Sequence, residues 1–172
     1  MSLLQRLFAR QPDSREELRP LWQVVVDEAR RPAWYAQQGV ADTVPGRFDM
    51  VTAVLSAVLL RMEGSEALKV PSVLLTELFV RDMDGQLREL GVGDPVVGKH
   101  VGKLVGAMGG RLAAYRDGLA GDDAALAEAA ARNLTFRDGG GDPAGVAADL
   151  RELAGRLART SDEQLLAGAI AP

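Results

Sequence analysis

The chain has 172 residues, of which 47% are hydrophobic, 26% charged and 5% aromatic, with a formal net charge of -4. This length and apolar fraction fit one globular domain and exclude intrinsic disorder as the main state. The absence of cysteine excludes disulfides, thiolate metal sites and cysteine nucleophiles, and one histidine, His100, cannot form a histidine pair around a metal. Because 24 acidic side chains outnumber 20 basic ones, the sequence predicts no DNA partner, and no motif calls for a cofactor.

Two segments bear on location. The longest apolar run, residues 50–60, has 11 residues, whereas a helix that crosses a bilayer needs about 20. The start, MSLLQRLFAR, lacks the pattern of a secretory signal, so we expect a cytoplasmic protein. Residues 1–12 are predicted to form an amphipathic turn. The alternatives for this turn are contact with a membrane surface or a ribosome, and a frayed or core-docked terminus.

The spacing of apolar residues, three and four apart, predicts an all-α, single-domain bundle of about seven to eight helices. Two capping boxes, Ser14 with Glu17 and Ser161 with Gln164, mark expected helix starts. In chain order, the predicted helices cover residues 14–30, 32–38, 47–62, 71–90, 96–119, 123–134, 143–159 and 161–170.

Charge is distributed unevenly along the chain. Residues 1–116 carry 15 basic and 14 acidic side chains, whereas residues 117–172 carry 5 and 10. We therefore expect a helical core over residues 13–134 and an acidic, Ala-rich helical hairpin over residues 135–172 that packs on this core. The glycine run 139–141 is a hinge candidate.

Asp82 is the carboxylate in the least expected place. Helical spacing puts it among Leu75, Leu78 and Phe79, inside an apolar stripe, where an unpaired charge is costly. One interpretation is a structural bond to a nearby arginine such as Arg47, or to backbone N–H groups. The other is a carboxylate for partner recognition or catalysis.

A ridge of small residues follows the sequence GVGDP. Its members, four residues apart, are Gly98, Gly102, Gly106, Gly110, Ala114 and Gly118, and Lys99 and Lys103 flank it. Each glycine costs helix stability, so close packing is expected to recover the loss. Either another helix of the domain packs on the ridge, or the ridge forms a groove for a helix of a client protein.

The segment before the 47–62 helix is typical of a helix start. Asp42 or Thr43 is expected to cap free N–H groups, and Gly46 to take an unusual backbone angle. Arg47 opposes the helix dipole there, so we expect a specific carboxylate partner. The segment GVGDPVVGK does not match the phosphate-binding motif GxxxxGK(S/T), because His100 follows Lys99 and no predicted strand precedes the segment. His100 is expected on the solvated surface.

Several motifs between Leu21 and Leu134 together resemble one family, the ubiquinol-cytochrome c chaperones. They are RRPAWYAQQGVADTVPGRFDM (residues 30–50), FVRDMDGQLRELGVGDPVVGKHVGKL (residues 79–104) and LAEAAARNL (residues 126–134). The resemblance implies a helical, non-enzymatic assembly factor for complex III that binds newly made cytochrome b. It also implies that the protein acts near the ribosomal exit site together with a small helical partner protein.

The sequence looks like a bacterial member, either cytoplasmic or peripheral at the inner face of the cytoplasmic membrane. Carried over by position, the partner-binding residues that the resemblance implies are Asp42, Arg47, Asp82, Asp84, Arg88, Glu89, Gly93, Asp94 and Lys99, and the ridge adds Gly102, Lys103 and Gly106. The alternative function is a bundle that binds a small molecule or lipid, or an unrecognised enzyme that uses Asp82 and Arg47.

Overall fold

The computed structural model describes residues 13–89 and 94–172, without the side chains of residues 87–88, 94–101 and 103–105. Over these ranges the chain forms α-helices and short 3-10 helices, and its single β-type contact is an isolated antiparallel bridge between Val40 and Phe136. The all-α prediction is therefore confirmed. The elements are η1 (Ser14–Leu18), α2 (Arg19–Ala29), α3 (Pro32–Ala36), α4 (Val44–Glu63), η2 (Glu66–Leu68), α5 (Lys69–Glu89), α6 (Asp94–Ala120), α7 (Asp123–Asn133), α8 (Pro143–Arg159) and α9 (Asp162–Leu166).

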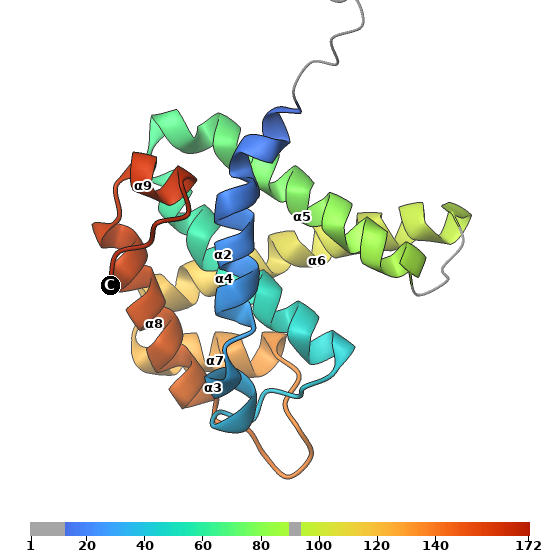
Figure 1. Ribbon diagram of the computed structural model, residues 1–172. Helices are drawn as coiled ribbons and strands as arrows, with labels where there is room; N and C mark the ends of the chain where they lie inside the picture. Colours follow the sequence, from blue (N-terminus) through green and yellow to red (C-terminus); the bar gives the residue numbers. More distant parts are fainter. Residues whose placement is uncertain (1–12, 90–93) are drawn as a thin grey trace, which may run out of the picture.

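Helix α4 is the centre of the bundle. It contacts α2, α5, α6 and α8, and its residues from Thr52 to Leu59 are all buried. Figure 1 shows it passing behind α2. The two hydroxyls in this apolar run are satisfied within the helix, since Thr52 donates to the Asp49 carbonyl and Ser56 to the Thr52 carbonyl. A helix that is apolar on every face is stable only when neighbours surround it.

The chain start differs from the prediction. Asp13, not Ser14, caps the first turn by accepting from the Arg15 N–H, so the predicted capping box of Ser14 and Glu17 is wrong. This turn is 3-10, and α2 begins at Arg19 because Pro20, which lacks an N–H, fits the first turn of an α-helix. The hydrogen bond from the Arg15 guanidinium lowers the pKa of Asp13 to about 2.

Helix α4 begins at Val44, three residues before the predicted start. Of the two predicted caps, Asp42 and Thr43, the structure has Thr43, whose hydroxyl accepts a hydrogen bond from the Gly46 N–H. The unusual backbone angle expected at Gly46 is wrong, because this residue is helical and the positive-φ glycines of the described chain are Gly39, Gly139, Gly140 and Gly168. Gly46 is needed for space. A Cβ there would lie 2.0 Å from the carbonyl oxygen of Ala41.

Helices α5 and α6 form an arm. The carboxyl-terminal half of α6 packs on α4 and α7 and buries Met108 and Tyr115. Its amino-terminal half extends away from the body next to the end of α5 (Figure 1). In the described part of the chain, no helix is long and apolar enough to cross a membrane.

The carboxyl-terminal helices pack against the other face of α4. Helix α8 contacts α4 and α7 and turns a buried face of Val146, Leu150, Leu153 and Leu157 toward them. The capping box of Ser161 and Gln164 is confirmed at the start of α9, but this helix ends at Leu166 rather than near residue 170. Gly168, with φ +74°, ends the helical path there.

Arg61 of α4 holds this end of the chain in place. Its guanidinium donates to the carbonyls of Leu157 and Thr160 and to the Asp162 carboxylate, at 2.7–3.0 Å. The hydrogen bonds from Ser65 and Arg61 lower the pKa of Asp162. The charged carboxylate is therefore the form that the folded chain stabilises.

Replacing Arg61 by Gln is expected to raise the pKa of Asp162 toward its ordinary value. Since the folded pKa is lowered, this carboxylate stabilises the docked α9 above the ordinary aspartate pKa and ceases to do so as the pH falls through the folded pKa. Carboxyl-carbon NMR titration measures the pKa, and hydrogen exchange of α9 measures docking. Arg132→Gln, at an exposed ion pair with Glu128, is the control. An unchanged Asp162 pKa in Arg61→Gln would contradict this interpretation.

Candidate functional site

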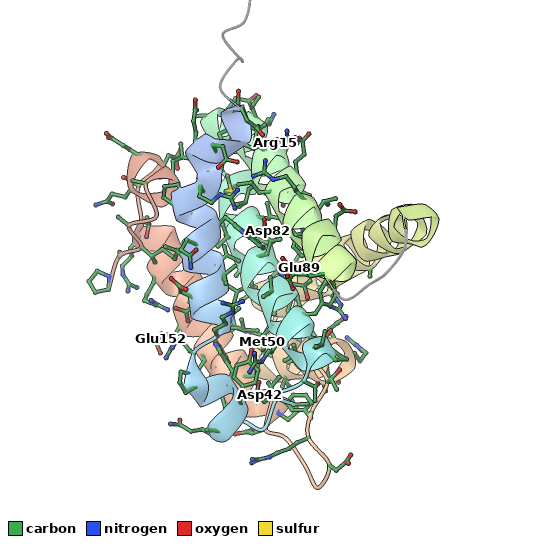
Figure 2. All side chains as sticks on the ribbon, turned by 45° about the vertical axis from the view of Figure 1, so that its right-hand side comes forward. Arg15, Asp42, Met50, Asp82, Glu89 and Glu152 are labelled. Carbon is green, nitrogen blue, oxygen red and sulfur yellow. The ribbon has the colours of Figure 1, made fainter. Side chains whose placement is uncertain are left out.

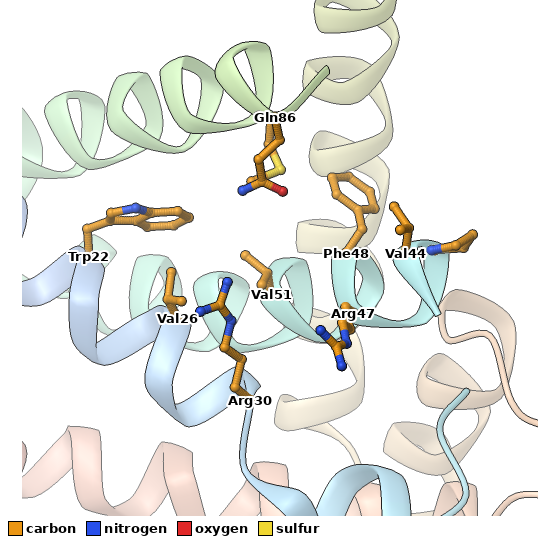
Figure 3. A pocket seen from close by; sticks show the side chains of 10 residues that line it. Trp22, Val26, Arg30, Val44, Arg47, Phe48, Val51 and Gln86 are labelled. Carbon is orange, nitrogen blue, oxygen red and sulfur yellow. The ribbon is translucent and has the colours of Figure 1, made fainter. Parts of the chain in front are cut away.

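An open, largely apolar pocket of about 380 Å³ lies between α2, α4 and α5 (Figure 3). Trp22 of α2 and Phe48 of α4 stand on opposite sides of it, and Gln86 of α5 closes it from above in this view. The guanidinium groups of Arg30 and Arg47 lie along the lower edge. The lining residues are Trp22, Val26, Arg30, Val44, Pro45, Arg47, Phe48, Val51, Met83 and Gln86.

Aromatic packing keeps the pocket walls apart. The buried ring of Phe79 on α5 contacts Trp22 edge to face, with 6.0 Å between ring centroids, and lies 6.2 Å from the ring of Phe48. It therefore packs near both of the rings that form the walls. Large, rigid rings leave a hollow beside them when the neighbouring side chains are as short as Val26 and Val51.

Asp82 supports one of these walls. Its carboxylate accepts a hydrogen bond from the indole N–H of Trp22 and lies 3.6 Å from the Arg19 guanidinium. With 31% of the side chain exposed, Asp82 lies at the edge of the apolar stripe, where Figure 2 labels it. Asp82 therefore makes the structural contact with an arginine that was one of its two interpretations, and the arginine is Arg19. The suggested partner Arg47 is wrong, because Arg47 lies at the start of α4 and bonds another carboxylate.

That carboxylate is Asp42. Arg47 Nε donates to Asp42 Oδ1 at 2.6 Å, and both side chains are well exposed. This bond lowers the pKa of Asp42 and raises the pKa of Arg47. A second hollow of about 340 Å³, which both residues line, shares Arg30 and Arg47 with the pocket. The enzyme alternative is not favoured, because Asp82 and Arg47 each bond a different partner.

The glycine ridge has two different environments. A Cβ added at Gly102, Gly106 or Gly110 would meet no described atom within 4 Å, whereas at Gly118 it would lie 3.0 Å from Leu126 of α7. The prediction that another helix of the domain packs on the ridge is therefore wrong at Gly102, Gly106 and Gly110 and confirmed at Gly118. At Gly102 and Gly106 the reason is the arm, since the amino-terminal half of α6 extends away from the bundle. Gly110 belongs to the packed half but lies on its exposed side.

Two further predicted site residues, Asp84 and Glu89, do not line the pocket. Glu89 is exposed at the end of α5, and Asp84 lines a separate hollow with Arg15 and Arg81. Several predicted positions are outside the part that the structure describes. The structure does not describe Gly93. It describes the backbone alone at Arg88, Asp94, Gly98, Lys99, His100 and Lys103. Among the described residues, no cluster of histidine and acidic side chains could hold a metal ion.

One buried network went unnoticed in the sequence. Asp49 of α4 accepts from Arg111 of α6 at 2.6 Å and from the backbone N–H and hydroxyl of Thr135 at 2.9 and 2.7 Å. Arg111 also donates to Thr52 and lies over the ring of Phe48, 5.2 Å from its centroid. The network therefore supports the second pocket wall. The sequence did offer a signal for this network, namely two polar residues, Asp49 and Thr52, three positions apart in a largely apolar helix.

Replacing Asp82 by Ala is expected to release the Trp22 indole and lower the free energy of unfolding by about 1.5 kcal/mol, the cost of a lost hydrogen bond to a charged group at a partly exposed position. Urea denaturation and tryptophan emission measure the two effects. Asp82→Asn keeps an acceptor for the indole and loses the charge that faces Arg19, so it should lie between wild type and Ala. Wild-type stability and emission in Asp82→Ala would refute the supporting role.

Taken together, the fold and the pocket define an all-α protein with an open apolar surface of the kind that binds other molecules. The model of the ubiquinol-cytochrome C chaperone family matches residues 36–171, so the chain belongs to that family. The match continues past Leu134, where the recognised motifs end, and includes α8 and most of the segment after it.

A solved structure agrees with this assignment. The crystal structure of the Cbp3 homolog from Brucella abortus is 33% identical, with a TM-score of 0.78, over 99% of this chain and 96% of that one. A comparison with curated proteins returned no match. The predicted resemblance to the family is confirmed.

Proposed function

We propose that this protein is a non-enzymatic chaperone that binds newly made cytochrome b and so assists the assembly of ubiquinol-cytochrome c reductase, complex III. Family membership supports the coarser role in complex III assembly. The observation that carries the client-binding step is the open pocket with walls of Trp22 and Phe48. An unassembled membrane protein exposes apolar helices, and such a pocket removes an apolar side chain from water at about 25 cal/mol per Å² buried.

The proposed client surface combines the pocket with the exposed glycines of α6. Gly102 and Gly106 leave the helix backbone open to close approach by another helix. The residues proposed to contact the client remain those predicted from the sequence: Asp42, Arg47, Asp82, Asp84, Arg88, Glu89, Gly93, Asp94, Lys99, Gly102, Lys103 and Gly106. A ribosome, a small helical partner protein and a peripheral membrane contact belong to the same proposal.

Replacing Gly106 by Ala separates binding from folding. Because none of the described atoms lies within 4 Å of the new Cβ, the variant should gain about 0.5–1 kcal/mol of unfolding free energy from helix propensity. If a client helix packs on this face, the same methyl group lowers client binding. Gly155→Ala, in the middle of α8 with only the end of Arg159 nearby, is the matched control that gains stability without losing client. Full client binding by a stabilised Gly106→Ala would remove the glycine face from the proposed surface.

The direct test is recovery of cytochrome b with the tagged chain after crosslinking in cells, quantified by haem difference spectra and by mass spectrometry. We expect cytochrome b with the wild type and a strong loss with Val26→Phe, which fills the pocket. Val70→Phe, at a residue that is 69% exposed and outside the pocket, should recover the wild-type amount. Equal recovery with Val26→Phe would show that the client does not use the pocket, and no recovery with the wild type would contradict client binding.

A further inference from the structure

Among the described residues that line the pocket, the two cations, Arg30 and Arg47, lie along one edge (Figure 3). Arg30, at the end of α2, is exposed, and within the described residues its guanidinium makes no hydrogen bond or ion pair. Arg47 faces the same edge but is already paired with Asp42. The ionisable side chains of the two adjoining hollows at this edge are Arg30, Arg47, Asp42 and the neutral Tyr35, whose pKa is raised by burial. The edge therefore has a net charge of +1.

Beside the Trp22 wall, the described residues offer no further unpaired cation. There, Arg19 and Asp82 lie 3.6 Å apart and Asp82 also accepts from the Trp22 indole, so the pair is already satisfied. The upper side is closed by the neutral amide of Gln86. Of the side chains that the structure describes here, a ligand thus meets apolar walls and one unpaired guanidinium, that of Arg30. Guanidinium groups bind carboxylates with two parallel hydrogen bonds, a geometry that a neutral group cannot match.

The apolar surface continues out of the pocket. Val44, which lines the edge at the start of α4, is 68% exposed. A ligand that fits entirely inside the pocket leaves this surface in water. A helix that inserts one large side chain and continues over the edge covers it. The exposed valine therefore favours a helix over a free amphiphile such as a fatty acid.

We infer that the pocket selects a client helix in which a large apolar side chain is followed, three or four residues later, by a carboxylate that pairs with Arg30. Residues at this spacing lie on the same face of a helix, so one can enter the pocket while the other reaches its edge. The inference rests on the proposed function, since it describes the segment that such a client would present.

The test uses the full chain and three tryptophan-free helical peptides that differ at one position. Each has Phe at its centre and Glu, Gln or Lys four residues later. Calorimetry measures affinity, and the emission of Trp22 reports occupation of the pocket. We expect the Glu peptide to bind about fivefold more tightly than the Gln peptide, which is the upper range for an exposed ion pair, and the Lys peptide to bind most weakly.

Variants of the chain assign this preference to Arg30. Arg30→Gln should bind the Glu and Gln peptides equally, and Arg30→Glu should prefer the Lys peptide. Arg132→Gln, at an exposed cation outside the pocket, should keep the wild-type order. Val26→Phe should bind none of the peptides, with Val51→Phe as a second blocking variant and circular dichroism to check folding.

The outcomes separate the inference from the proposed function. Equal binding of the three peptides by the wild type would overturn the charge selection. Decanoate, a fatty acid, is titrated in the same way, and saturation of the pocket by decanoate with no peptide binding would also overturn it. Either result leaves recovery of cytochrome b in cells untouched. Conversely, a preference for Glu that Arg30→Glu reverses would support the inference even if no cytochrome b were recovered.

Discussion

Replacing Asp49 by Ala is expected to lower the free energy of unfolding by about 3 kcal/mol and the melting temperature by about 10 °C. The side chain is 7% exposed and joins three parts of the fold, α4, α6 and the segment after α7. Its removal leaves the Arg111 guanidinium without its carboxylate and the N–H of Thr135 without its acceptor. An uncompensated buried charge is one of the few changes that cost this much.

Two further variants test this account by urea denaturation. Asp42→Ala removes a carboxylate from an ion pair of similar geometry, but its side chain is 58% exposed, so the expected change is within about 0.5 kcal/mol. Arg111→Met combined with Asp49→Ala should cost less than the two single changes added together, because neither charge is then left alone. Wild-type stability in Asp49→Ala would show that the network does not hold α6 against α4.

Replacing Gly46 by Ala is expected to destabilise the fold by about 3 kcal/mol and to distort the pocket. The added Cβ would lie 2.0 Å from the carbonyl oxygen of Ala41 and 3.0 Å from its carbon. These are backbone atoms, so the contact is relieved only by moving the first turn of α4. That turn positions Val44, Arg47 and Phe48, and we therefore expect weaker client binding together with the loss of stability.

Gly155→Ala is the matched control for this variant, since the same added methyl group meets only the end of Arg159 there and the position is outside the proposed client surface. Thermal unfolding and the emission of Trp22 report the two expected effects of Gly46→Ala. A variant with wild-type melting temperature and emission would show that the first turn of α4 yields without cost, contrary to this account.

The sequence predicts most of the helices because each signal is local. Apolar spacing gives the helix type, and the bounds of α8 match the prediction at both ends. The starts at Pro32 and Pro143 were predicted correctly, but two other helices with a proline in the first turn were not. Pro20 and Pro45 each stand in the first turn of an α-helix, and both starts were placed wrongly. Since proline favours that position, the signal was present.

The candidate site is less predictable, because it depends on which helices lie side by side. Asp42 and Arg47 are five residues apart, and a carboxylate partner for Arg47 followed from the helix dipole. The partners of Asp82 lie on α2, and Arg111 is 62 residues from Asp49, so no local pattern identifies them. The pocket itself is space that three helices leave unfilled, which no single segment encodes.

The glycine ridge shows the same limit. Four-residue spacing predicts a ridge of small residues along one helix, and α6 is that helix. What the ridge faces is a tertiary property. Gly118 packs on Leu126, while a Cβ at Gly106 would meet no described atom within 4 Å. At 100° per residue the two positions also lie about 120° apart around α6.

The central claim is tested most directly in the source organism. Membranes from cells with and without the gene are compared for quinol-to-cytochrome c reductase activity and for cytochrome b, measured by difference spectra. The account predicts that both fall in the deletion strain, return with the wild-type gene and stay low with Val26→Phe, whose pocket is filled. Unchanged activity and unchanged cytochrome b in the deletion strain would contradict it.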